Sequence, residues 1–274
     1  MAYKRILTIQ DISCVGQCSM TVALPILSAC GHETCILPTA LLSTHTGGFG
    51  TPAVVHFDAA LPDIWRHWQS RGIRFDTILV GYLGSLQAIE MAGEIMDTLL
   101  IPGGTAIVDP AMGDNGRLYA GFDEIYVREM KKLCEKADVI LPNITEAALL
   151  SGNPYEEKLN KCYVNKLLDD LTESRVILTG VGYEEGQTGV VLKTGDTRQY
   201  FPHERIGKGY HGTGDIFAAC FTGAWMQGKT VEESIQIAGN FTKKSIENTV
   251  KCSEHWYGVK FETALPELMT SLGL

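Results

Sequence analysis

Near its carboxyl end this 274-residue chain reads Tyr210-His211-Gly212-Thr213-Gly214-Asp215-Ile216-Phe217-Ala218-Ala219. The two glycines permit a tight turn and let the backbone approach a ligand closely. The apolar residues that follow predict a helix over about 214–227, and the unpaired N–H groups and positive dipole end of its first turn suit a phosphate. A carboxylate is unexpected at an anion site, unless Asp215 accepts a proton from an attacking group. The alternative is that Asp215 only favours the helix dipole.

Upstream of this stretch, short apolar runs alternate with segments of helical periodicity. Such alternation predicts βαβ units, and hence an α/β fold with a mostly parallel central sheet between two layers of helices. The expected strands are Arg5–Ile9, Thr34–Leu37, Thr77–Val80, Thr105–Val108, Val139–Leu141 and Val176–Thr179, and helices are expected near 19–30, 58–70, 85–100, 121–136 and 157–171.

The stretch 187–202 interrupts this alternation. Gln187–Leu192 and Thr197–Phe201 are separated by Lys193-Thr194-Gly195-Asp196, which predicts a β-hairpin. Two consecutive helices, over about 214–227 and 231–250, and a short helix near 262–271 are expected after it. Because the sequence has no low-complexity linker and no internal repeat, we expect a single domain over 1–274.

The composition is that of an ordinary globular protein, with 45% hydrophobic and 20% charged residues. The formal net charge of −9, from 23 Lys and Arg against 32 Asp and Glu, argues against a nucleic acid or a membrane surface as partner, because both bind basic surfaces. No window approaches a membrane-spanning apolar run, and the amino terminus resembles a first strand rather than a signal peptide. The eight cysteines form no C-x-x-C pair, so we expect reduced thiols and a cytoplasmic protein.

Polar residues follow other predicted strands, at the edge where open parallel sheets bind ligands. Asp109 and Asp114 come after the strand that ends at Val108, and they either hold Mg²⁺ through water or are solvated loop aspartates. Asn143 and Glu146 have the spacing of a helix N-cap and its capping-box partner. The functional alternative makes Glu146 an outer ligand of Mg²⁺ and Asn143 a contact to phosphate or to metal-bound water.

A further loop, Ser43-Thr44-His45-Thr46-Gly47-Gly48, follows the second predicted strand. His45 could pair with a ring hydroxyl of a ligand and Thr46 with a ring nitrogen. A single histidine is more often a structural residue than a ligand contact, so this loop alone does not identify a site.

Two matches to known motifs are misleading. Residues 223–230 fit the P-loop pattern G-x-x-x-x-G-K-[ST], which must follow a strand and open a helix. Here an apolar helix precedes it, Gly228 has the position of that helix's C-terminal cap, and Thr230 with Glu233 forms a capping box for the next helix. We therefore predict two consecutive helices in place of a nucleotide loop. Gly180-Val181-Gly182 lacks the full G-x-G-x-x-G pattern and is a weak dinucleotide signal.

Taken in chain order, these loops resemble those of the pyridoxal kinases of the ribokinase-like superfamily. The resemblance covers essentially the whole chain and implies the three-layer, ribokinase-like α/β/α fold. Each segment is weak alone, and six in order are specific. The segments are Thr8-Ile9-Gln10, Ser43 through Gly47, Gly81-Tyr82-Leu83-Gly84-Ser85, Asp109 through Asp114, Asn143 through Glu146, and Gly212 through Asp215.

The resemblance implies ATP-dependent phosphorylation of the 5′-hydroxymethyl group of pyridoxal, pyridoxine or pyridoxamine. Asp215 would remove the hydroxyl proton, and the N–H groups of Gly212, Thr213 and Gly214 would stabilise the transferred group. Mg²⁺, a response to a monovalent cation such as K⁺, and a homodimer are also implied. The expected contacts are Asp109 and Glu146 to Mg²⁺; Asp109, Asp114, Asn143, Glu146, Thr179 and Gly212 through Gly214 to ATP; and Asp11, His45, Thr46, Tyr82 and Asp215 to the vitamer.

One position departs from the family. The better-known pyridoxal kinases have a serine that touches the pyridine ring where this chain has Asp11, which could pair with a protonated ring nitrogen or with the amine of pyridoxamine. The nearest alternative is hydroxymethylpyrimidine (phosphate) kinase of thiamine synthesis, a related family that typically places Cys where Asp215 stands. A non-catalytic vitamer-binding protein on the same fold is a second alternative, although the base and the metal carboxylates are present.

Overall fold

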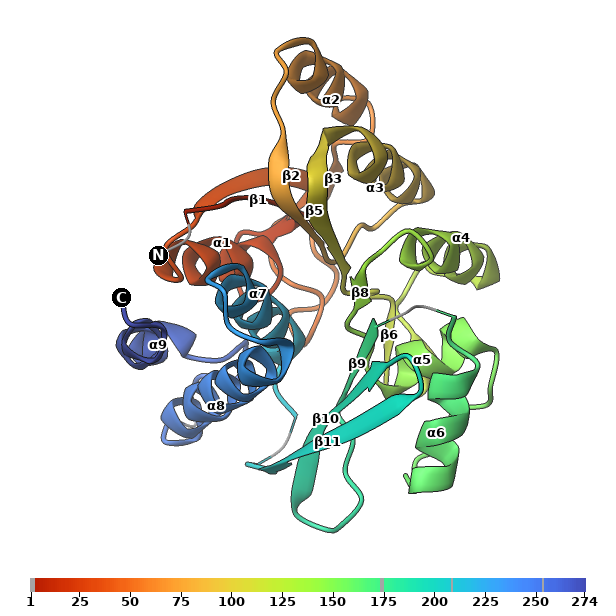
Figure 1. Cartoon of the computed structure of the whole chain (residues 1–274), viewed down its shortest axis with the longest axis vertical. Coiled ribbons are helices and arrows are strands. Elements are labelled where there is room, and N and C mark those ends of the chain that lie inside the picture. The colour runs from red at the N-terminus through yellow and green to blue at the C-terminus, as the bar shows by residue number, and fades with distance from the viewer. Residues whose placement is uncertain (1–2, 173–174, 208, 253) are drawn as a thin grey trace.

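Within the residues that the computed structural model describes, 3–172, 175–207, 209–252 and 254–274, a nine-stranded sheet runs through the centre of the molecule (Figure 1). Its strands lie in the order β11-β10-β9-β8-β5-β4-β1-β2-β3. Their bounds are β1 (Arg5–Ser13), β2 (Glu33–Leu42), β3 (Val54–His56), β4 (Phe75–Val80), β5 (Leu100–Val108), β8 (Val139–Ile140), β9 (Arg175–Thr179), β10 (Gln187–Thr194) and β11 (Thr197–Glu204).

The strands from β9 to β2 in this order run parallel to one another. Antiparallel strands lie at the two ends of the sheet, with β3 at one end and the β10–β11 hairpin at the other. The chain passes from β1 to β2 on one side and later reaches β4 on the other side of β1. β1 and β4 therefore flank a topological switch point, where open α/β sheets bind ligands. The predicted mostly parallel sheet is confirmed.

Helices cover both faces of this sheet (Figure 1). Side chains alternate along the buried strands, so that Ile6 and Leu79 pack on one face while Leu7 and Ile78 pack on the other. This double-sided burial gives the three-layer α/β/α, ribokinase-like architecture that the resemblance implied. One face carries α1 (Met20–Ala29), α7 (Thr213–Met226), α8 (Val231–Val250), the short 3-10 helix η1 (Phe261–Ala264) and α9 (Leu265–Leu272), and the other carries α2 (Leu61–Ser70), α3 (Leu86–Leu99), α4 (Glu124–Cys134), α5 (Ile144–Ser151) and α6 (Lys161–Asp169).

The structure adds short elements to those predicted. These are β3, α5 and a small hairpin of β6 (Gly113–Asp114) and β7 (Arg117–Leu118). α5 has eight residues and nearly all of them are buried, so its sequence shows no apolar stripe that would distinguish it from a strand. The elements β3, β6 and β7 are two or three residues long and are held by their partners rather than by local preference.

Several predicted strand boundaries are wrong, among them the end of β1, which continues to Ser13, the start of β5, which lies at Leu100, and the end of β11, which lies at Glu204. Two further differences show the physical reason. The second strand continues to Leu42 instead of ending at Leu37, because β1 pairs with β2 along its whole length. The hairpin turn contains only Gly195 and Asp196, because Lys193 and Thr194 stay paired in the ladder between β10 and β11. In both cases the boundary depends on a neighbouring strand.

The junction between α7 and α8 confirms that residues 223–230 are not a P-loop. α7 ends at a cap at Gln227, and Gly228 follows with a φ of 93°. The Thr230 hydroxyl accepts a hydrogen bond from the Glu233 N–H, and the Glu233 carboxylate accepts one from the Thr230 N–H. The segment begins within helix α7 and does not directly follow a strand. Among the described helices, none is both long and apolar enough to span a membrane.

Candidate active site

The glycine-rich turn before α7 lies against the loop that follows β1. Gly212 is the N-cap of α7 and has a φ of 79°, a conformation that favours glycine. A Cβ at Gly212 would lie 2.0 Å from the backbone oxygen of Gln17, so a larger residue would force the two loops apart. The cap provides no side-chain hydrogen bond, which leaves first-turn N–H groups of α7 for a ligand.

Asp215 lies in this first turn and is largely enclosed by protein atoms, although it keeps some exposed surface. Burial raises the pKa of Asp215 to about 6, where hydrogen bonding from the Ser19 backbone N–H lowers the pKa and the negative charge of Asp11 raises it. A carboxyl group with this pKa is mostly ionised at neutral pH and is basic enough to accept a proton, as a general base must.

Two further acidic side chains lie beside this turn. Asp109 directly follows β5, and a Cβ at Gly214 would lie 4.0 Å from its Oδ2 atom. Burial and the charge of Asp215 raise the pKa of Asp109 well above its usual value. Burial and the charge of Asp109 do the same to the pKa of Glu146. The three carboxyl groups thus form a row in which the charge of Asp215 raises the pKa of Asp109 and the charge of Asp109 raises the pKa of Glu146.

Asn143 and Glu146 form the capping box that their spacing predicts. Asn143 Oδ1 accepts a hydrogen bond from the Glu146 N–H at 3.0 Å, and Glu146 Oε2 accepts one from the Asn143 N–H at 2.8 Å. Their remaining polar atoms hold the loop after β5, since Asn143 Nδ2 donates to the Gly113 oxygen at 2.9 Å and the Met112 N–H donates to Glu146 Oε1 at 3.2 Å. The box that caps α5 therefore also positions the loop that begins at Asp109.

The carboxylate oxygens of Asp109 and Glu146 are the kind of ligand that Mg²⁺ prefers. In the described part of the chain, no group of three or more His, Cys, Asp or Glu side chains is placed to hold a metal ion. Two carboxylates fit Mg²⁺ that takes its other ligands from water and phosphate oxygens. Asp114 lies apart from this pair, because its exposed carboxylate accepts hydrogen bonds from the backbone and side chain of Asn115.

The ends of β1 and β4 meet across the switch point. The Asp11 N–H donates to the backbone carbonyl oxygen of Tyr82 at 3.1 Å, and the Ser13 hydroxyl donates to Asp11 Oδ2 at 3.2 Å. Burial raises the pKa of Tyr82 to about 12, and the charge of Asp11 adds to the rise. The Tyr82 ring also stacks on Phe122, with centroids 5.5 Å apart. An acidic group and an aromatic ring therefore lie together on the side of the site that faces β1.

His45 is held entirely by the protein. Its Nδ1 accepts a hydrogen bond from the Gly47 N–H at 2.9 Å. Nε2 therefore carries the proton and donates to the backbone carbonyl oxygen of Tyr257 at 3.1 Å. Burial lowers the pKa of His45, in keeping with this neutral form. Both ring nitrogens are thus engaged, and a ligand would meet a ring edge unless these bonds change. Thr46 is exposed, and the His211 ring lies 5.0 Å from that of His45.

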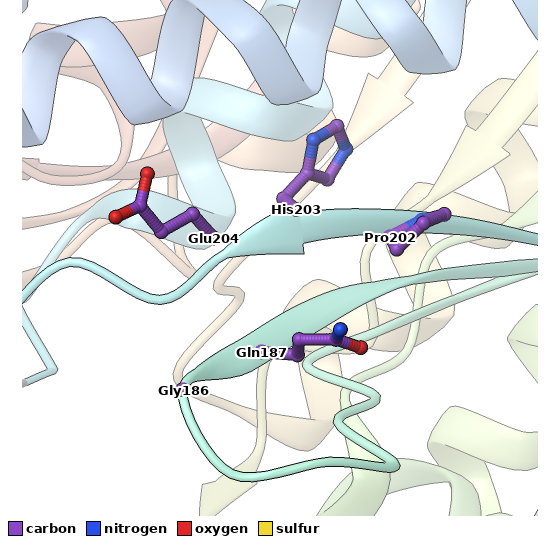
Figure 2. A pocket seen from close by; sticks show the side chains of 5 residues that line it. All are labelled: Gly186, Gln187, Pro202, His203 and Glu204. Carbon is purple, nitrogen blue, oxygen red and sulfur yellow. The ribbon is translucent and has the colours of Figure 1, made fainter.

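Thr179 lies farther along the same edge of the sheet, at the end of β9, where its hydroxyl donates to the Pro142 oxygen at 3.3 Å. Figure 2 shows a pocket at the open end of the β10–β11 hairpin. One of its residues, His203, packs against Gly239 of α8. Since β8 and β9 separate this hairpin from β5, the pocket is distinct from the row of carboxyl groups at Asp109. It is lined by Gly186, Gln187, Pro202, His203 and Glu204.

Ser19, Gln17 and Tyr257 contact the site, and the sequence does not predict them. Ser19 precedes a helix, which is where an ordinary N-cap serine stands. Its role appears only in space, because its N–H faces Asp215 in a remote turn. Tyr257 is separated from His45 by 212 positions. No local pattern marks such residues.

The family model described as phosphomethylpyrimidine kinase matches residues 38–260. The chain belongs to this family. Within the phosphomethylpyrimidine kinase family, similarity to enzymes named for vitamin B6 is extensive, and the predicted resemblance to pyridoxal kinases of the ribokinase-like fold is confirmed.

Three relatives illustrate this similarity. This member of the phosphomethylpyrimidine kinase family is 34% identical to pyridoxal kinase from Lactobacillus plantarum, with 97% of each chain covered and a TM-score of 0.90. It is also 34% identical to a Bacteroides thetaiotaomicron protein, provisionally named phosphomethylpyrimidine kinase and crystallised with pyridoxal, with 97% and 96% covered and a TM-score of 0.91. A curated relative, the pyridoxine/pyridoxal/pyridoxamine kinase of Bordetella avium, is 25% identical over 259 residues, which cover 88% of this chain and 84% of that protein.

Proposed function

We propose that this chain is an ATP-dependent kinase that phosphorylates the 5′-hydroxymethyl group of pyridoxal, pyridoxamine or pyridoxine. The observation that carries the proposal is the position of Asp215. A largely enclosed carboxyl group, with its pKa raised to about 6, lies in the first turn of a helix whose N-terminus is open to an anion. It does so in a chain that is 34% identical to a pyridoxal kinase over nearly its whole length.

The reaction divides into roles for the residues of this turn. Asp215 accepts the hydroxyl proton while the hydroxyl oxygen attacks the γ-phosphorus of ATP. The bond from that phosphorus to its bridging oxygen breaks, and ADP leaves. N–H groups of Gly212, Thr213 and Gly214 donate to the oxygens of the transferred group, which is where charge develops.

The remaining acidic residues organise the nucleotide. Asp109 and Glu146 would hold Mg²⁺ together with water and phosphate oxygens, and the ion would neutralise phosphate charge. Asp114, Asn143 and Thr179 lie along the same edge and are assigned to the phosphates or the sugar. A monovalent cation such as K⁺ belongs to the same proposal, to be tested by replacing KCl with NaCl in the assay.

The vitamer would occupy the side of the site near β1. Tyr82 offers an aromatic face to a pyridine ring, and His45, Thr46 and Asp11 would line the same pocket. We further propose that the protein forms a homodimer, as the resemblance implies. A cytoplasmic setting is part of the proposal because all eight cysteines, each within the described residues, are free thiols.

A second candidate is hydroxymethylpyrimidine (phosphate) kinase, which the description of the matching family favours. The acid at position 215 argues against this candidate, since the hydroxymethylpyrimidine (phosphate) kinases of thiamine synthesis typically have Cys at the corresponding place. A non-catalytic vitamer-binding protein is disfavoured because Asp215, Asp109 and Glu146 are all retained.

ADP release from MgATP, measured separately with pyridoxal, pyridoxine, pyridoxamine and hydroxymethylpyrimidine, tests the proposal. Turnover of at least one B6 vitamer, with the 5′-phosphate as the product by mass spectrometry, is expected. Turnover of the pyrimidine alone would move the protein to the second candidate. Binding of a vitamer without any ADP release would favour the non-catalytic alternative.

A further inference from the structure

Asp11 is a buried acidic residue for which none of the described residues is a cationic partner. Only 3% of its surface is exposed. Of the ion pairs among the described residues, none includes it. Burial raises the pKa of Asp11, and the groups that oppose the rise are the hydroxyls of Ser19 and Ser13 and its own backbone N–H, all of them neutral. A buried carboxylate is normally paired with an opposite charge, and within the part of the chain that the structure describes no residue supplies one to Asp11.

The place of Asp11 in the fold is where a ligand would meet it. It lies near the end of β1, and its N–H donates to the Tyr82 oxygen just beyond β4, so it stands at the switch point of the sheet. Asp11 is also close enough to Asp215 for its charge to raise the pKa of that residue. A small molecule whose hydroxyl group reaches Asp215 therefore presents its neighbouring atoms to Asp11.

The backbone at Ser19 is arranged around these two acids. Ser19 is the N-cap of α1, but its side chain makes no capping hydrogen bond, unlike most serines at this position. Its φ of 51° and ψ of −129° are strained for a residue other than glycine. In this conformation the Ser19 hydroxyl donates a hydrogen bond to the Asp11 carboxylate, and the Ser19 N–H donates one to the Asp215 carboxylate. The strained Ser19 backbone therefore provides a neutral hydrogen-bond donor to each carboxylate, while α1 lacks a side-chain cap.

We propose that Asp11 receives a protonated nitrogen of the substrate and thereby helps to determine which substrate is accepted, an inference that rests on the proposed B6 kinase function. All three vitamers carry a ring nitrogen that can be protonated, and pyridoxamine carries an ammonium group as well. A charge-assisted hydrogen bond in an enclosed site is stronger than a neutral one. The substrate cation would also relieve the repulsion between Asp11 and Asp215.

The test compares the wild-type enzyme with Asp11→Asn, which keeps the size of the side chain and removes its charge. Values of kcat/KM are measured for the three vitamers and for a pyridoxine analogue in which a CH group replaces the ring nitrogen. A loss of tenfold or more for all three vitamers, with little change for the analogue, supports recognition of the ring nitrogen. A comparable loss confined to pyridoxamine supports recognition of its amine.

The controls separate a chemical effect from misfolding. Asp196→Asn, in the exposed turn between β10 and β11, makes the same substitution away from the site and should leave all four values unchanged. Calorimetric binding of each vitamer to Asp215→Asn and to the double variant Asp11→Asn/Asp215→Asn gives a readout that needs no turnover. Should Asp11→Asn fail to fold, Asp11→Ser takes its place in both measurements.

The outcomes distinguish the inference from the function on which it rests. If the wild type turns over the vitamers and the Asp11 variant changes none of the four values, or lowers all four equally, the inference is wrong and the B6 kinase function stands. If the wild type turns over no vitamer at all, both are wrong.

Discussion

Gly212 and Gly214 are two residues apart in the same turn but have different surroundings. A methyl group at Gly212 would meet the Gln17 backbone oxygen at 2.0 Å, and the φ of 79° is itself unfavourable for alanine. We predict that Gly212→Ala lowers the free energy of unfolding by about 2 kcal/mol or more and abolishes most turnover. The measurement is chemical denaturation together with kcat.

Gly214→Ala is the matched control for stability. Of the atoms in the described residues, a methyl group there would have only Asp109 Oδ2 nearby, at 4.0 Å, and Gly214 lies in a helical turn where alanine is favoured. Its stability should equal or exceed that of the wild type while kcat falls, because the methyl group would intrude on the space assigned to the transferred phosphoryl group. Equal stability of the two variants would contradict the strain assigned to Gly212.

Single residues differ in how far the sequence predicts them. Gly212 and Asp215 can be predicted because a glycine turn, an acid and an apolar helix are adjacent in the chain. The hydrogen bonds of His45 cannot, since one of its two partners is Tyr257. The sequence marks Ser19 as a potential N-cap, yet in the structure its side chain does not cap α1 and hydrogen-bonds Asp11 instead. Residues whose partners are remote escape local patterns.

At the scale of elements, two capping boxes offer a direct comparison. Asn143 caps α5 beside the carboxyl groups, and Thr230 caps α8 on the exposed surface. We predict that Asn143→Ala and Thr230→Ala each lower the free energy of unfolding by about 1 kcal/mol. Only Asn143→Ala should also lower the apparent affinity for Mg²⁺, by about tenfold, because the loop after β5 loses its hydrogen bond from Asn143 to Gly113.

Titration of activity with Mg²⁺ at saturating substrate checks this difference. Thr230→Ala should follow the wild-type curve, since its box lies at the junction of α7 and α8. If the two variants lose stability to the same extent and show the same Mg²⁺ dependence, the capping box of α5 has no role beyond capping.

Elements were predictable where one chain segment decides them. The capping signal of α5 was visible in Asn143 and Glu146, but the helix itself has no polar face, so its periodicity carries no information. The length of β2 and the size of the hairpin turn depend on pairing with neighbouring strands, which the sequence alone does not place. Long amphipathic helices such as α4 were the most reliable.

At the scale of the whole molecule, the parallel sheet is what assembles the site. Asp11 lies near the end of β1, Tyr82 and Asp109 follow β4 and β5, and Asp215 lies in the first turn of α7. The sheet order makes β1, β4 and β5 neighbours and brings their ends to one edge. The sequence predicts parallel strands and hence a shared edge, but not which ends are neighbours, because strand order is a property of the packed layers. The single domain over 1–274 stays a proposal, which limited proteolysis without a stable half-sized fragment would support.

The central claim is that Asp215 is the base of a B6 kinase, and the pH dependence of kcat/KM for pyridoxal in the wild type and in Asp215→Asn tests it most directly. Burial raises the pKa of Asp215 to about 6, and only the ionised carboxylate accepts a proton, so wild-type kcat/KM should fall as the pH drops through about 6. Asp215→Asn should still bind vitamer and MgADP, lose about 10²- to 10⁴-fold in kcat, and lack this acidic limb. A variant that keeps more than about one tenth of the wild-type kcat, or that retains the same limb, would contradict the assignment.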